Sequence, residues 1–124
     1  MQNKMENQHM RLISFTLIAA LLTTAPSLSA QSTTGIFDIS KEACSHEFSD
    51  GRLEVTPTAI QFWESSCDLT NPTNLRGLPD AKLYDAVCYG EGEEWTYRVM
   101  LATDYRGDLI RYTQEGAWTS VRCQ

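Results

Sequence analysis

The stretch that decides the fold spans residues 90–101 and reads Gly-Glu-Gly-Glu-Glu-Trp-Thr-Tyr-Arg-Val-Met-Leu. Its first four residues are typical of a turn, and from Trp95 to Leu101 large apolar side chains occupy every second position. Such alternation indicates a strand with one buried face, because successive side chains of a strand point to opposite sides. A tight turn that leads into an alternating run predicts the returning strand of an antiparallel hairpin.

Further strands are expected on both sides of this hairpin. The strand that enters it covers residues 82–89 and carries Leu83, Val87 and Tyr89 on one face. The other candidates are 53–56, a run from Ile60 towards Cys67, 109–113 and 118–123, with turns at 57, 106–108 and 114–116.

The remaining segments are expected to be irregular or helical. Residues 31–35 are small and polar and predict a loose tail, and residues 40–44 predict one short helix with Ser40 as its cap. Residues 68–80 are expected to form a long loop, because they hold Asn71, Pro72, Asn74, Gly77 and Pro79. The sequence therefore predicts an all-β fold, a small antiparallel meander of about six strands that forms a barrel or a strongly curved sheet.

The first thirty residues have the pattern of a cleaved signal peptide. Two basic residues precede a mostly apolar run from Leu12 to Leu22, and small residues lead up to Ala30. The run is shorter than the roughly 20 residues that a membrane-spanning helix needs, so a transmembrane anchor is the less favoured alternative. We expect cleavage after Ala30, with Met10 as an alternative start. The mature domain then covers residues 31–124 and is periplasmic or secreted in a bacterium, without membrane insertion.

Composition and charge narrow the class of protein. The chain has 124 residues, of which 42% are hydrophobic, and a formal net charge of -6. These values exclude a disordered polymer, a collagen and a coiled coil, and leave room for one domain. Loss of Lys4, Glu6 and Arg11 with the signal peptide leaves 8 basic and 15 acidic residues, a net charge of -7. An acidic surface repels phosphates, so nucleic acid is not an expected partner, and we expect a soluble monomer.

All four cysteines belong to the mature region: Cys44, Cys67, Cys88 and Cys123. An even number in a short exported domain predicts two disulfides, although four cysteines allow three pairings and the sequence does not choose among them. The expected topology favours one pairing, because a hairpin would bring Cys67 close to Cys88. Cys44 and Cys123 would then join the two ends of the domain. A zinc site is the rival interpretation and is disfavoured, since no Cys-x-x-Cys pair is present.

The acidic turn is the most unusual local feature. Glu91, Glu93 and Glu94 lie next to Trp95. These carboxylates suit a hard cation such as calcium, or a basic protein partner with Trp95 as an aromatic anchor. The third alternative is a solvated hairpin tip whose acids prevent edge aggregation while Trp95 packs inward.

Other motifs give little indication of chemistry. The mature region holds one histidine, His46, and lacks a Gly-x-Ser-x-Gly element, so neither zinc hydrolysis nor serine catalysis is predicted. We expect no enzyme, no metal and no cofactor. Three tryptophans and five tyrosines are more than a small core can bury. Some of these rings should therefore lie on the surface or line a shallow cleft.

Three segments carry a resemblance to known proteins: Ile-Gln-Phe-Trp-Glu-Ser-Ser-Cys at 60–67, Cys-Tyr-Gly-Glu-Gly-Glu-Glu-Trp at 88–95, and Arg122-Cys123. With them the chain resembles small exported bacterial four-cysteine domains of unassigned role. The resemblance implies a compact disulfide-linked β domain in the periplasm and supplies no catalytic residues. By size, export, acidity and disulfides the chain is also loosely similar to periplasmic lysozyme inhibitors of small β-barrel type, although their inhibitory loop motif finds no match in it.

These observations predict a non-enzymatic binding or inhibitor module. Its expected partner is a basic periplasmic or extracellular protein that contacts Glu91, Glu93, Glu94 and Trp95. The alternative is a lipocalin-like barrel that holds a small apolar ligand, which requires an interior cavity.

Overall fold

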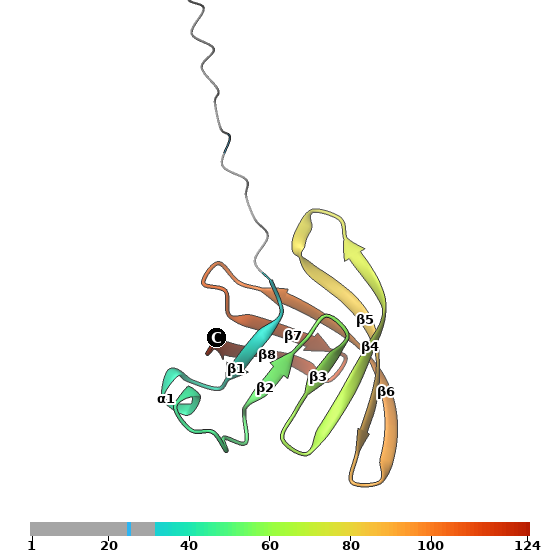
Figure 1. Cartoon of the computed structure of the whole chain (residues 1–124). Coiled ribbons are helices and arrows are strands. Elements are labelled where there is room, and N and C mark those ends of the chain that lie inside the picture. Colours follow the sequence, from blue (N-terminus) through green and yellow to red (C-terminus); the bar gives the residue numbers. More distant parts are fainter. Residues whose placement is uncertain (1–24, 26–31) are drawn as a thin grey trace, which may run out of the picture.

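The structure is a computed structural model that describes Ala25 and residues 32–124 (Figure 1). The predicted signal peptide over residues 1–30 and its alternative start at Met10 fall outside the described residues, apart from Ala25. Within the described part of the chain, no helix has the length and hydrophobicity needed to cross a membrane.

Eight antiparallel strands follow one another in chain order around a closed barrel, and the last pairs with the first. They are β1 (Gly35–Asp38), β2 (Leu53–Val55), β3 (Ala59–Gln61), β4 (Ser65–Leu75), β5 (Leu78–Gly90), β6 (Glu93–Thr103), β7 (Leu109–Thr113) and β8 (Gly116–Arg122). The short helix α1 (Lys41–Cys44) lies between β1 and β2. The predicted all-β barrel is confirmed, with eight strands where about six were expected.

The inward side chains of β6, which alternate with outward ones, form one side of the core. Val99 and Leu101 point into the barrel and are fully buried. They pack with inward side chains of the neighbouring strands, among them Phe37, Ile60 and Leu109. Small barrels are filled by side chains in this way, because inward and outward positions alternate on every strand. On β5 the buried face carries Tyr84, Ala86 and Cys88, which is the opposite face from Leu83, Val87 and Tyr89.

The predicted hairpin is formed by β5 and β6, which pair from Gly90 with Glu93 to Ala81 with Ala102. A turn of two residues joins the strands, and both have positive φ, 50° at Glu91 and 79° at Gly92. That combination defines a type I′ turn, whose twist matches the right-handed twist of the two strands.

The prediction of a long loop over residues 68–80 is wrong. β4 and β5 continue through this region and meet at a tight turn where Gly77 has a φ of 81°. Pro72 is tolerated because the register shifts between Thr70 and Thr73, and because β3 pairs with β4 only as far as Asp68. A proline at a bulge on an unpaired edge removes no ladder hydrogen bond.

Two further expectations also need correction. The run from Ile60 towards Cys67 is not one strand, since the chain reverses after β3 and the backbone N–H of Phe62 donates to the carbonyl oxygen of Ser65 at 2.8 Å. The expected loose tail over 31–35 ends in β1, which begins at Gly35 and pairs with both β2 and β8.

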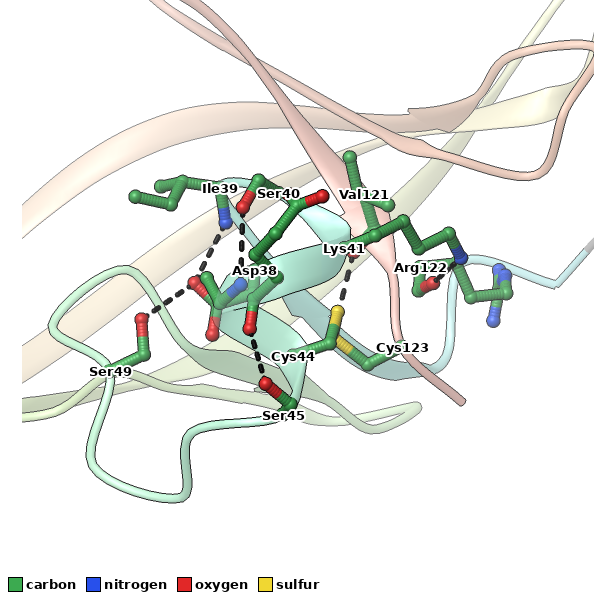
Figure 2. Close-up of a disulfide and its surroundings, with 12 residues drawn as sticks. Asp38, Ile39, Ser40, Lys41, Cys44, Ser45, Ser49, Val121, Arg122 and Cys123 are labelled. Carbon is green, nitrogen blue, oxygen red and sulfur yellow. Dashed lines mark hydrogen bonds between the residues drawn. A yellow bond between two sulfur atoms is a disulfide. The ribbon is translucent and has the colours of Figure 1, made fainter.

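Both predicted disulfides are present. Cys67 and Cys88 are direct partners across β4 and β5, and Cys44 joins α1 to Cys123 just after β8 (Figure 2). The helix is capped as predicted, because the Ser40 hydroxyl accepts a hydrogen bond from the N–H of Ala43 at 3.1 Å. Two disulfides are compatible with a protein that matures outside the reducing cytosol.

Candidate functional site at the barrel mouth

A pocket of about 780 Å³ opens at the end of the barrel that holds the β3–β4, β5–β6 and β7–β8 turns. It exists because β6 extends further than β7, which pairs with it only from Met100 to Thr103. The first half of β6 therefore stands without a neighbour on that side, and the space next to it stays open. We call this space the mouth pocket; it is lined by Phe62, Ser65, Cys67, Trp95, Thr96, Tyr97, Arg98, Arg111, Thr113, Gln114, Glu115 and Trp118.

Below the mouth pocket the barrel is solid. Val99 and Leu101 follow Tyr97 on the inward face of β6 and have no exposed surface. The cavity is thus confined to one end, and its inner boundary is the packed core rather than a channel. A ligand in this pocket would remain partly exposed to solvent at the mouth.

Arg111 is the charged group at the centre of the pocket lining. It lies on β7 directly opposite Leu101 of β6 and Trp118 of β8, so its side chain shares their inward face. The guanidinium carbon is 5.0 Å from the centre of the Phe62 ring and 5.1 Å from that of Trp118. Both distances are within the range of a cation–π interaction. Burial lowers the pKa of this guanidinium, and the nearby Tyr97 opposes the effect.

Tyr97 lines the pocket beside the Cys67–Cys88 disulfide. Its hydroxyl oxygen lies 3.7 Å from the Sγ of Cys67, so the phenol rests against the Cys67–Cys88 disulfide. Burial raises the pKa of the Tyr97 phenol; the positive charge of Arg111 lowers it, and the carboxylate of Glu115 raises it. The phenol is therefore neutral near pH 7, since its ordinary pKa is already about 10.

Gly90 allows the rim of the pocket to close up around Trp95. A methyl group at Gly90 would lie 2.8 Å from the Cβ of Ser65 and 3.2 Å from the Trp95 ring. The first contact is shorter than real Cβ atoms show and the second is unusually tight, so a side chain here would push the β3–β4 turn or the indole aside. Trp95 remains 40% exposed and forms the outer edge of the pocket.

The structure only partly brings the four predicted site residues together. Trp95 lines the mouth pocket, whereas Glu91, Glu93 and Glu94 are exposed at the tip of the β5–β6 hairpin. In the described residues none of these three carboxylates takes part in an ion pair. Over the same residues, no group of three or more His, Cys, Asp or Glu side chains is placed to hold a metal ion.

The remaining candidates from the sequence are also placed. His46 is exposed just beyond the end of α1. Surplus aromatic residues do lie on the surface and in a cleft as expected, since Trp95, Tyr97 and Trp118 all line the mouth pocket.

Sequence reasoning missed Arg111, the central residue of the pocket. The sequence did indicate an inward position for this residue, because Arg111 lies on the same face of strand 109–113 as Leu109 and Thr113, both of which are buried. A charged residue at an inward position of an otherwise apolar face is unusual and therefore informative.

Comparison with models of known protein families, with curated proteins and with solved structures gives no match to this chain. The function must therefore be argued from the geometry of the site itself.

Proposed function

We propose that the protein is an exported, non-enzymatic binding protein whose ligand enters the mouth pocket. The observation that carries this proposal is a β-barrel with a packed core at one end and an aromatic-lined cavity of about 780 Å³ at the other. Ligand sites in proteins are concave, mostly apolar and provided with a few polar groups. The mouth pocket is concave and combines aromatic rings from three separate elements with polar groups, among them Arg111.

The lining also supports binding rather than catalysis. Its titratable groups are Tyr97, Arg98, Arg111 and Glu115. Burial raises the pKa of Tyr97, and a guanidinium such as that of Arg111 stays protonated at neutral pH even where burial lowers its pKa, so neither group suits proton transfer near pH 7. Arg98 pairs with Asp85 at 3.0 Å. We accordingly assign Tyr97 and Arg111 to recognition.

The proposal is tested by titration of the mature protein with 2-naphthoate, 2-naphthylmethanol and 2-naphthylmethylammonium, three probes that share one flat ring system. Binding is measured by isothermal calorimetry and by quenching of tryptophan fluorescence. We expect at least one probe to bind at micromolar to millimolar concentration, and Trp118→Ala to weaken it several-fold. Failure of all three probes to bind the folded protein would refute the proposal.

A second candidate function is contact with a basic protein through the hairpin tip. It is favoured by the exposure of Glu91, Glu93 and Glu94, all of which lack an ion-pair partner among the described residues. Replacement of the three by Lys should abolish capture of a basic partner from periplasmic extract. Unchanged capture by this variant would exclude the tip as the contact.

A further inference from the structure

We infer that the ligand of the mouth pocket is a small organic acid, with its anionic group at Arg111 and a flat apolar body against the surrounding rings. The inference rests on the proposed function and specifies its ligand class. It follows from the state of Arg111, from the charges around it and from the shape of its surroundings.

The first step is that Arg111 has cation–π partners but no anionic one. Within the described residues, no carboxylate lies within 4.0 Å of its guanidinium, and its N–H groups donate no hydrogen bond to the protein. Arg98 and Arg106 both pair with aspartates, and Arg122 donates to three carbonyl oxygens. Arg111 is therefore different from these three arginines of the barrel.

The second step concerns energy. A guanidinium has five N–H donors in one plane, and holding them in a half-buried site without acceptors is costly. Stacking between Phe62 and Trp118 offsets part of that cost, because both rings attract the cation through their faces. Stacking leaves the edge of the guanidinium, where the hydrogens lie, free to donate. A carboxylate accepts two such donors at once.

The third step excludes other classes of ligand. A cationic ligand would be repelled by Arg111, and the rings that would stack on it already hold the guanidinium. A purely apolar ligand would displace water from the N–H groups and supply no acceptor. The nearest acid in the lining is Glu115, on the β7–β8 turn, where its carboxylate acts on Tyr97. An organic anion satisfies Arg111 and uses the aromatic walls as well.

The size of the pocket agrees with a small molecule. Trp95 and Tyr97 line the pocket, and Phe62 and Trp118 lie beside Arg111, so a flat body of one or two rings finds aromatic surface to pack against. Since the inner end is closed by the core, the anion lies inside and the apolar body points outward to the rim.

The test uses the same three naphthalene probes and compares their affinities. We expect 2-naphthoate to bind at least roughly tenfold more tightly than 2-naphthylmethanol, and 2-naphthylmethylammonium to bind most weakly. In Arg111→Met, which keeps a long apolar side chain, the advantage of the carboxylate should fall to under about twofold. Arg76→Met is the matched control, because Arg76 is exposed on the β4–β5 turn and does not belong to the pocket lining, and it should leave the order and the ratio unchanged.

The outcomes separate the two proposals. Equal binding of the carboxylate and the alcohol by the wild-type protein would overturn the inference, while the binding function would stand. An advantage that persists in folded Arg111→Met, or that is lost equally in Arg76→Met, would also overturn it. The order of the three probes on the wild-type protein tests the inference even if a variant fails to fold.

Discussion

Asp104 illustrates how one carboxylate organises a turn of the barrel. Its Oδ1 accepts hydrogen bonds from the backbone N–H groups of Arg106 at 2.8 Å and Asp108 at 3.0 Å. These bonds set the loop between β6 and β7, in which Gly107 has a φ of 85°. Burial acts to raise the pKa of the Asp104 carboxyl. The two N–H groups and the Arg106 guanidinium outweigh burial and hold the pKa below its ordinary value.

Replacement Asp104→Asn should lower the melting temperature at pH 7, because the amide loses the charge that strengthens both hydrogen bonds. A carboxyl with a lowered pKa in the folded state stabilises above its unfolded pKa, and this contribution disappears as the pH falls through the folded value. The difference between variant and wild type should therefore shrink below about pH 4. Thermal denaturation followed by circular dichroism from pH 7 to pH 2 gives the difference in melting temperature between variant and wild type at each pH. A difference that stays constant over this range would contradict this account.

Glu91 occupies a left-handed backbone conformation, with φ of 50° at the first position of the β5–β6 turn. Asparagine adopts this conformation more easily than other non-glycine residues. We expect Glu91→Asn to raise the free energy of unfolding by about 0.5 kcal/mol. Urea denaturation measures the change. Glu94→Asn on the adjacent strand serves as control and should give no gain, because asparagine is a poor strand former.

At the scale of elements, the long hairpin of β4 and β5 tolerates residues that usually end strands. Pro72→Ala should lower the free energy of unfolding by only about 0.5 to 1 kcal/mol, through greater freedom of the unfolded chain. Ala86→Pro is the contrasting variant. Ala86 is buried and paired on both sides, with Leu69 and Tyr97. The Ala86→Pro substitution should lower the free energy of unfolding by at least about 3 kcal/mol, because proline removes a ladder hydrogen bond and clashes in a central strand. Similar losses of unfolding free energy for the two variants in urea denaturation would contradict the assignment of Pro72 to an edge and of Ala86 to the centre of the sheet.

These elements show what the sequence could predict. The alternation from Trp95 to Leu101 predicted β6, its buried face and its turn, because that strand has one face in the core and one in solvent. The segment 68–80 was predicted as a loop for sound local reasons, since Asn71 does adopt positive φ and Pro72 does lack a donor. Its pairing is a long-range property: the free edge left by a short β3 makes both residues acceptable in a strand.

The site was less predictable for a similar reason. Trp95 was singled out through its acidic neighbours, which the structure leaves outside the pocket. Arg111 reaches its place only because the register puts it opposite Leu101 and Trp118. Strand alternation gives the direction of a side chain, but the partner across the barrel depends on how three strands align.

At the scale of the whole molecule, the barrel is closed by the pairing of its first strand, β1, with its last strand, β8. This pairing has two register pairs, Phe37 with Arg122 and Asp38 with Val121. The Cys44–Cys123 disulfide lies beside this join and links residues 79 apart in sequence (Figure 2). The bond therefore adds a covalent link at the seam where the first and last strands of the barrel meet.

Removal of this disulfide by Cys44→Ala with Cys123→Ala should lower the free energy of unfolding by about 4 kcal/mol, from the entropy that the long loop gains in the unfolded chain. The Cys67–Cys88 bond spans 21 residues, so its removal should cost about 3 kcal/mol from the same source. Guanidinium denaturation of both double variants measures the two values. A loss below about 1 kcal/mol at Cys44–Cys123 would show that the barrel closes without it.

The early end of β7 has a kinetic consequence. Since no strand pairs with the first half of β6 on the side of β7, a molecule bound in the mouth pocket would leave sideways without displacing any of the described strands. Its residence time is then set by its contacts alone, and stopped-flow displacement should show release as a single fast phase.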